Sequence, residues 1–198
     1  MLLDRAPYEP EPWRSRLANP EAFLSQPDAY DLLEKRPDIF ATLRNTISIT
    51  SLKGSDKVNV IPPEASAELD CRLLPGWTVE RWVDQLRSVI GDPSIRIDVI
   101  LNFPPATSST DTPLFEAVQQ TVHELDPGAG VVRSVSAGFT DSHFFREKGI
   151  VSYGFSAYGL TTENFQRVHG DNERIPVKNY TNGLHVLWGV VSDFSRAK

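Results

Sequence analysis

The sequence predicts a chain of mixed class, in which an α+β module is followed by an α/β segment. Predicted strand, strand, helix and strand follow one another between residues 45 and 101, and helices alternate with short strands from residue 112 onward. The stretch NFPPATSSTD between them combines paired prolines with a Ser/Thr cluster, which is typical of a linker. We therefore expect a proline-rich helical arm over 1–44, domains over 45–101 and 112–198, and a hinge over 102–111.

The first module contains the clearest strand pattern of the chain. In EASAELDCRLL polar residues alternate with an apolar face that comprises Ala65, Ala67, Leu69, Cys71 and Leu73. NTISITSLKG and SIRIDVIL are predicted as further strands of an antiparallel sheet. TVERWVDQLRSVI has apolar residues at helical spacing, with Thr78 as its N-cap. A single helix covers such a sheet poorly, so we expect this module to be incomplete.

The second segment predicts strands joined by helices. TPLFEAVQQTVHEL begins with Pro113 at the first helical position, and TDSHFFREKG reads as a helix that ends at Gly149. VVRSVS and IVSYGF are predicted as short strands, and PVKNYTNGLHVLWGVVSDF as the final helix. This alternation favours parallel pairing through right-handed crossovers. Two or three strands are too few for a free-standing sheet, so a partial α/β domain is expected.

Composition narrows the range of partners. A formal net charge of -6 and a pI near 5.2 disfavour nucleic acid, which is bound by basic surfaces. The most apolar stretch, GLHVLWGVV, is far shorter than the roughly 20 residues that cross a bilayer, so no membrane partner is expected. Cys71 is the one cysteine and no secretory signal is visible at the start. We expect a cytoplasmic location, although a secreted protein without disulfides fits the same cysteine count.

Several familiar catalytic signatures fail on inspection. GFSAYG has one residue too many for a nucleophile elbow, and His123-Glu124 is not followed by the second histidine of a zincin. The sequence has no Walker motif, glycine-rich dinucleotide loop or CxxC pair. Nucleophilic and nucleotide-dependent enzymes are therefore disfavoured.

The segment SAGFTDSHFF places glycine and threonine between a predicted strand and a predicted helix. Backbone N–H groups of Gly138 through Asp141 can face an anionic or carbonyl ligand there, and Thr140 is expected to cap the helix. An ordinary strand-to-helix turn explains the same residues, and the local sequence alone favours it.

Two further sites carry polar residues suited to binding. His169 lies in QRVHGDNERI ahead of the last helix, where a neutral imidazole can bind zinc, although a lone histidine is more often structural. Arg72 is on the polar face of its strand, where a guanidinium can hold a substrate carboxylate. A salt bridge to Asp70 or Glu68 is the simpler alternative for Arg72. Asn59 belongs to the same candidate site.

Three segments in chain order resemble signatures of the M20 peptidase family. KVNVIPPEASAELDCRLLPG is similar to the NVIP-through-DxRxLPG signature, AGFTDSHFFREKGIVSYGF to the GxTD segment, and RVHGDNERIPV to the C-terminal histidine segment. Together they cover roughly residues 45 to 195, and three motifs in order are far more specific than one. The long proline-rich arm resembles the carboxypeptidase S and N-acyl amino acid hydrolase branch.

The resemblance implies a fold and a role for each site residue. Residues 45–101 would form an incomplete ferredoxin-like lid domain able to pair as a homodimer, and residues 112–198 the end of the catalytic domain. His169 would bind one of two zinc ions, and Asp141 would stabilise its own loop. The substrate, a peptide or an N-acyl amino acid, would contact Asn59, Arg72, Gly138 and Thr140. A metal-bridging water attacks the amide in such enzymes, with a glutamate as general base.

The chain departs from the family at the amino-terminal half of the catalytic domain. The HxD ligand motif, the bridging aspartate and the paired glutamates have no counterpart in these residues. One histidine cannot hold a catalytic zinc, which usually has about three protein ligands. We therefore expect the chain to be inactive without that N-terminal half, which is its expected partner. The alternative is a non-catalytic dimerisation or docking module derived from such an enzyme.

Overall fold

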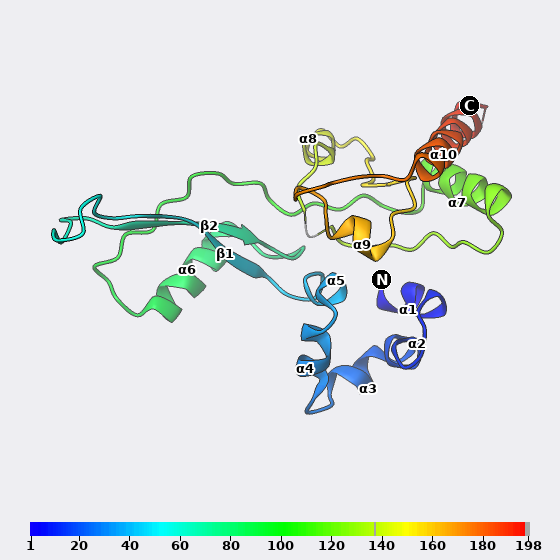
Figure 1. The fold of residues 1–198 in the computed structure, drawn as a ribbon. Helices are drawn as coiled ribbons and strands as arrows, with labels where there is room; N and C mark the ends of the chain where they lie inside the picture. The colour runs from blue at the N-terminus through cyan, green and yellow to red at the C-terminus, as the bar shows by residue number, and fades with distance from the viewer. Residues whose placement is uncertain (137, 197–198) are drawn as a thin grey trace. The chain divides into compact units, whose positions relative to one another are not determined.

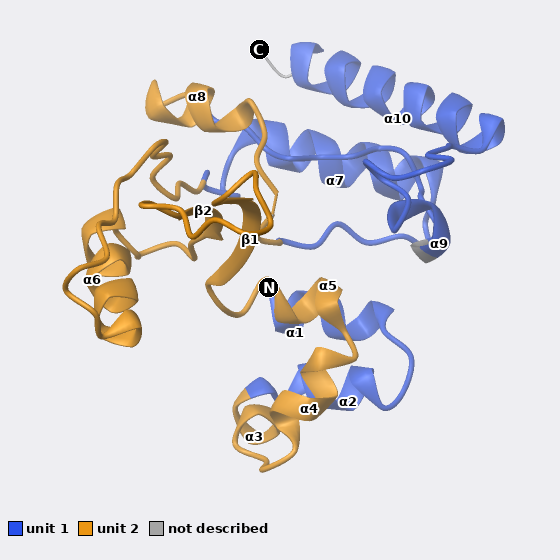
Figure 2. Ribbon diagram, turned by 60° about the vertical axis from the view of Figure 1, so that its left-hand side comes forward, with its two compact units in different colours: residues 1–20, 108–133, 151–198 blue, residues 21–107, 134–150 orange. Residues whose placement is uncertain are grey.

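The computed structural model describes residues 1–136 and 138–196 as two compact units. Unit 1 combines residues 1–20, 108–133 and 151–198, and unit 2 combines residues 21–107 and 134–150 (Figure 2). Ala137, which belongs to the AGFTD motif, lies outside the described residues. Each unit is described by itself below.

Helices dominate the described chain, with one pair of strands (Figure 1). The arm contains α1 (Leu2–Arg5), a 3-10 turn (Ala6–Tyr8), α2 (Trp13–Ala18), α3 (Pro20–Leu24), α4 (Ala29–Glu34) and α5 (Pro37–Phe40). After it come β1 (Thr46–Lys53), β2 (Ser66–Arg72), α6 (Val79–Ile90), α7 (Pro113–Leu125), α8 (Ser142–Glu147), α9 (Thr162–Phe165) and α10 (Val177–Arg196). In the part of the chain covered by the structure, no helix is long and apolar enough to cross a bilayer.

In unit 1 the longest helices, α7 and α10, lie side by side (Figures 1 and 2). α7 begins as the sequence predicts, with Pro113 in its first turn and the Thr112 hydroxyl accepting a hydrogen bond from the Phe115 N–H at 3.2 Å. The Thr121 hydroxyl, buried between the two helices, donates to Asp193 Oδ2 at 2.8 Å. This polar contact is satisfied inside an apolar interface and fixes the register of the two helices.

In unit 2 the two strands form an antiparallel ladder, as predicted. Thr46 pairs with Arg72 at one end and Lys53 with Ser66 at the other, with an irregularity between Ile49 and Ser51. The Lys53 ammonium lies 3.1 Å from Glu68 Oε1 across the strands. Both side chains are exposed, so this pair adds little, and the backbone ladder sets the register of the hairpin.

The predicted helix after the hairpin is confirmed as α6. The Thr78 hydroxyl accepts a hydrogen bond from the Arg81 N–H at 3.3 Å, and Gly91 ends the helix in the left-handed conformation (φ 66°). However, α6 contributes no buried side chain. No residue from 41 to 116 is buried, so this module lacks a closed hydrophobic core of its own.

The best-packed side chains outside α7 and α10 belong to the arm. Two of its helices, α3 and α4, form within the phrases PEAFLSQ and PDAYDLLEKR, as the sequence predicts. Leu17 of unit 1 and Phe23, Leu33 and Ile39 of unit 2 are almost completely buried. Each of these short helices therefore depends on packing of one or two apolar residues, because helices this short are unstable alone.

Three predicted strands do not form. SIRIDVIL (94–101), VVRSVS (131–136) and IVSYGF (150–155) contain no strand, and the described residues form one sheet, of two strands. The predicted ferredoxin-like sheet is therefore reduced to one antiparallel hairpin, and the predicted parallel pairing does not form among the described residues. The physical reason is that a strand needs a neighbour for its backbone groups, and alternation alone does not supply one. Leu101, for example, remains 75% exposed.

The α7–α10 contact gives a test of unit 1. A β-carbon at Gly189 would lie 2.5 Å from Thr121 Cγ2, which is too close for two carbon atoms. We expect Gly189→Ala to lower the free energy of unfolding by about 1–3 kcal/mol, because the helices must move apart. Urea unfolding measures this loss. Gly154→Ala is the control, since nothing lies within 4 Å of its β-carbon, and an equal loss in both variants would contradict the close approach.

An ion pair joins distant segments of unit 1. Arg133 makes a two-pronged contact with Asp4 of α1, with Nε 2.5 Å from Oδ2 and Nη2 2.8 Å from Oδ1. The hydrogen bond from Arg133 lowers the pKa of Asp4 from 3.8 to about 2. Desolvation acts in the opposite direction and the N-terminal ammonium adds to the lowering. The charged carboxylate is therefore the form that stabilises the fold.

The sign of the pH dependence follows from the lowered pKa. We expect the wild-type chain to be more stable than Asp4→Asn above about pH 4, and this advantage to disappear as the pH falls toward the folded pKa of Asp4, about 2. Urea unfolding of both proteins across that range measures the difference. Arg133→Gln should reproduce the effect because it removes the same contact. A stability difference that persists unchanged at pH 2 would contradict this account.

Candidate functional site

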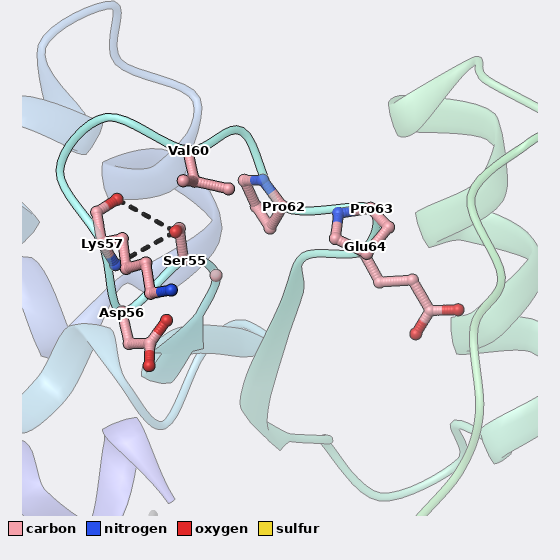
Figure 3. A pocket seen from close by; sticks show the side chains of 8 residues that line it. Ser55, Asp56, Lys57, Val60, Pro62, Pro63 and Glu64 are labelled. Carbon is pink, nitrogen blue, oxygen red and sulfur yellow. Dashed lines mark hydrogen bonds between the residues drawn. The ribbon is translucent and has the colours of Figure 1, made fainter.

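The loop between β1 and β2 carries Asn59, which is exposed in a turn. The Ser55 hydroxyl accepts a hydrogen bond from the Lys57 N–H at 3.1 Å and donates to the Lys57 carbonyl at 3.0 Å (Figure 3). An open pocket of about 380 Å³ lies beside the turn, lined by residues 54–57, 60 and 62–64. Figure 3 shows its walls, with Lys57 and Asp56 on one side and Pro62, Pro63 and Glu64 on the other.

Arg72 ends β2 and pairs with Asp70 two residues earlier. Its Nε lies 2.5 Å from Asp70 Oδ1 and its Nη2 2.7 Å from Oδ2, so the contact is bidentate. The simpler alternative that the sequence offers for Arg72 is thus present. Both side chains remain about 40% exposed, so the guanidinium is also accessible to a ligand. Exposed pairs of this kind contribute little to stability.

Within unit 2, Asn59 and Arg72 lie at opposite ends of the hairpin. Arg72 faces Thr46, whereas Ser66 faces Lys53 next to the loop that carries Asn59. Arg72 is six residue steps along the strand from Ser66, which corresponds to about 20 Å. The structure therefore does not bring these two predicted residues into one contact.

The loop ahead of α8 carries Gly138, Thr140 and Asp141, all exposed. Two expectations for this loop are wrong. The Gly138 N–H is not free, because it donates to the Ser136 hydroxyl at 3.2 Å. Thr140 does not cap the helix either, since the N-cap is Asp141 and no side chain accepts a capping hydrogen bond. α8 starts one residue later than a threonine cap requires, so only the Thr140 carbonyl takes part, accepting from the His143 N–H at 3.1 Å.

An aromatic cluster surrounds the start of α8, and the sequence patterns did not reveal it. Phe103, from the predicted hinge, packs against Phe139 with ring centroids 4.6 Å apart. Phe144 lies against both rings at 6.0 and 5.9 Å. His143 is buried among the three, at 5.2 to 5.6 Å from each ring. The available signals were FPP at 103–105 and HFF at 143–145, but these lie 40 residues apart and no periodicity connects them.

His169 lies in unit 1, in the turn between α9 and α10. Its side chain is exposed and its backbone is left-handed (φ 64°), and its N–H donates to Glu173 Oε2 at 3.1 Å. Glu163 Oε1 forms ion pairs with Arg167 at 3.1 Å and Arg174 at 3.0 Å. One arginine precedes His169 in the sequence and the other follows it. These two ion pairs of Glu163 stabilise the turn. The imidazole of His169 remains exposed to solvent and accessible to a ligand.

A metal site requires several donor side chains gathered in one place. No group of three histidine, cysteine, aspartate or glutamate side chains comes together in residues 1–136 and 138–196. His169 can supply one ligand, but a catalytic zinc usually has about three from protein. The residues present therefore do not form a complete metal site.

Comparison with known proteins identifies the family. The Peptidase dimerisation domain of the M20 family matches residues 9–98. The N-fatty-acyl-amino acid synthase/hydrolase PM20D1 of Homo sapiens is 31% identical over 188 residues, which are 93% of this chain and 37% of that protein. The Probable carboxypeptidase S-like 2 of Dictyostelium discoideum is 30% identical over 171 residues, 85% of this chain and 33% of that protein.

Solved structures match the fold. The M20 family metallo-carboxypeptidase Sso-CP2 from Sulfolobus solfataricus matches 98% of this chain and 44% of its own, with a TM-score of 0.64 and 15% identity. The di-peptidase Dug1p from Saccharomyces cerevisiae matches 85% of this chain and 36% of its own, with a TM-score of 0.55 and 15% identity. At this identity the likeness concerns the fold.

The chain therefore belongs to the M20 peptidase family. Its relatives in that family include PM20D1 and carboxypeptidase S-like proteins, as the proline-rich arm and the three motifs predict. The chain spans 37% of the human PM20D1 and 33% of the Dictyostelium protein.

The exposed Arg72–Asp70 pair gives a test of the site. We expect Arg72→Ala to change the free energy of unfolding by less than about 1 kcal/mol, because the pair is solvated. Urea unfolding measures this, with Arg87→Ala as control, since Arg87 pairs with Asp84 on exposed α6 at 3.1 Å. A loss above about 2 kcal/mol for Arg72→Ala alone would show that Arg72 has a structural role beyond an exposed pair.

Proposed function

We propose that this chain provides the lid and the C-terminal part of a dinuclear zinc-dependent amide hydrolase that acts on peptides or N-acyl amino acids. The observation that carries the proposal is the relationship over 93% of the chain to a protein named N-fatty-acyl-amino acid synthase/hydrolase. The M20 carboxypeptidase and dipeptidase folds that match the chain support the same reaction class.

In this proposal His169 provides one ligand to one of two zinc ions. Three features support the role: the exposed imidazole, the turn fastened by Glu163, and the backbone hydrogen bond to Glu173. The remaining ligands and the general base belong to an N-terminal catalytic half that these 198 residues do not contain. The chain alone is therefore inactive.

The substrate contacts are divided between the lid and the loop ahead of α8. Arg72 binds the substrate carboxylate in place of Asp70. The Arg72–Asp70 pair is exposed, so a substrate can displace Asp70. Asn59 lies about 20 Å away along the hairpin, so it serves a different site from Arg72 of the same chain. In a homodimer formed through the lid, Asn59 of one protomer contributes to the site of the other. Gly138 and Thr140 contact the substrate in the complete enzyme, and Asp141 stabilises their loop.

The proposal keeps the domain division over 1–44, 45–101, 102–111 and 112–198. The family's dimerisation domain matches residues 9–98, so it extends over most of the arm as well as the lid. The hinge at 102–111 then separates the dimerising part from the catalytic part of the chain.

A non-catalytic dimerisation or docking module is the second candidate. It is favoured by the absence of any buried residue between positions 41 and 116, which leaves apolar side chains of this module available to another chain. Such a module would assemble without contributing to hydrolysis.

Mixing the chain with a separately produced N-terminal catalytic half distinguishes the two candidates. We expect hydrolysis of N-acyl amino acids to appear only in the mixture. The rate should fall by about 100-fold or more with His169→Ala, because one zinc ligand is lost. Turnover and zinc content are measured together.

His185→Ala is the matched control, because His185 is also exposed but lies within α10. Tight assembly without activity supports the docking module. Zinc at full occupancy with turnover in the chain alone would contradict the proposed dependence on the N-terminal half.

A further inference from the structure

We propose that Tyr158 and Tyr180 position the loop that displays His169, because their stacked rings join the two ends of this loop. The loop comprises residues 159–179 and includes α9. This inference rests on the proposed function, in which His169 provides a ligand, and it adds two positioning residues to that site. Neither tyrosine lies within the three motif segments of the sequence.

The ends of the loop meet through two adjacent contacts. The rings of Tyr158 and Tyr180 are stacked, with their centroids 5.7 Å apart and their planes 5° from parallel. Next to them in the sequence, the Asn179 side-chain amide donates a hydrogen bond to the Gly159 carbonyl. Positions 159 and 179 are 20 residues apart, so these contacts close the loop at its base.

Gly183 leaves room for the Tyr158 ring against α10. This glycine is buried about one turn after Tyr180, and a β-carbon on it would be too close to Cδ1 and Cε1 of Tyr158. Glycine in the interior of a helix lowers helix stability relative to alanine. The close approach of the ring accounts for a glycine at this position, and it fixes the base of the loop to the helix.

The loop has no hydrophobic core of its own. No side chain that the structure describes between positions 159 and 179 is buried. The polar contacts around His169, which are the ion pairs of Glu163 and the hydrogen bond to Glu173, are exposed. Exposed ion pairs contribute little to stability. The conformation of the loop therefore depends on its closed base.

Two residues of the loop increase this dependence. His169 and Asn172 have left-handed backbones, with φ of 64° and 58°. Residues other than glycine remain in this conformation only where the surrounding structure holds them. Since the exposed contacts beside His169 are weak, the stacked tyrosines supply this restraint and so determine where the imidazole lies.

Amide hydrogen exchange, measured by NMR on the 198-residue chain, tests this role. The amides at positions 165 and 167–170 are hydrogen-bonded, so their exchange reports opening of the loop. We expect Tyr180→Ala to speed their exchange by about three- to tenfold, because the stacked ring is lost. The His169 ring signals should shift toward those of an unfolded chain, while the amides of α7 keep their wild-type rates. Tyr180→Phe should behave as wild type, since it retains the ring.

Gly183→Ala tests the same base without removing a ring. Alanine favours the helical conformation, so α10 by itself gains stability from this substitution. The added β-carbon displaces the Tyr158 ring, however, and we expect exchange in the loop to speed up as it does in Tyr180→Ala. A role of Gly183 in helix stability alone predicts the opposite result.

Trp188→Ala is the matched control. Trp188 is an aromatic residue of the same helix, is 74% exposed and makes no ring contact among the described residues, so its loss should leave the loop unchanged. Four results would overturn the positioning role: unchanged loop exchange in Tyr180→Ala, an equal effect of Trp188→Ala, equal acceleration in the loop and in α7, or a Tyr180→Phe variant that behaves like Tyr180→Ala.

Hydrolysis by the mixed halves separates this inference from the proposed function. In the mixture we expect Tyr180→Ala to lower kcat with little change in KM, and Tyr180→Phe to restore kcat. A loop that opens in Tyr180→Ala supports the positioning role even if the mixed halves do not hydrolyse amides. Restored hydrolysis that Tyr180→Ala leaves unchanged supports the proposed function and removes the positioning role.

Discussion

A β-strand persists only where a neighbour satisfies its backbone N–H and C=O groups, and this requirement governs what the chain builds. β1 and β2 meet it through their mutual ladder. The segments 94–101, 131–136 and 150–155 have strand-like sequences without such a neighbour, and they run as irregular chain. A helix satisfies its backbone hydrogen bonds internally, so α6, α7 and α10 form without a neighbouring strand.

The same distinction explains how much of the fold could be predicted. Thr78 and Thr112 cap their helices as expected, because a cap depends on residues three positions away. The predictions of strands at 94–101, 131–136 and 150–155 failed because strand formation depends on partners that are remote in sequence. The placement of Thr140 failed for a local reason, since a one-residue shift of the helix start transfers the cap to Asp141.

For the candidate site, the sequence indicates the residue types but not their neighbours. The pairing of Arg72 with Asp70 was foreseen as one of two alternatives, since alternate strand residues share a face. The aromatic cluster was not, because it joins Phe103 to residues 139–144 across a long separation that no periodic pattern spans. Site residues also fall in both units, with His169 in unit 1 and Arg72 and Thr140 in unit 2.

The left-handed turn at His169 has an energetic consequence for the protein. A residue with a β-carbon pays roughly 1–2 kcal/mol in this backbone conformation, a cost that glycine avoids. Folding stability alone would therefore favour glycine at position 169, where the chain instead has a histidine with φ 64°. The chain therefore carries a side chain at this position at a cost in folding free energy that a glycine would avoid.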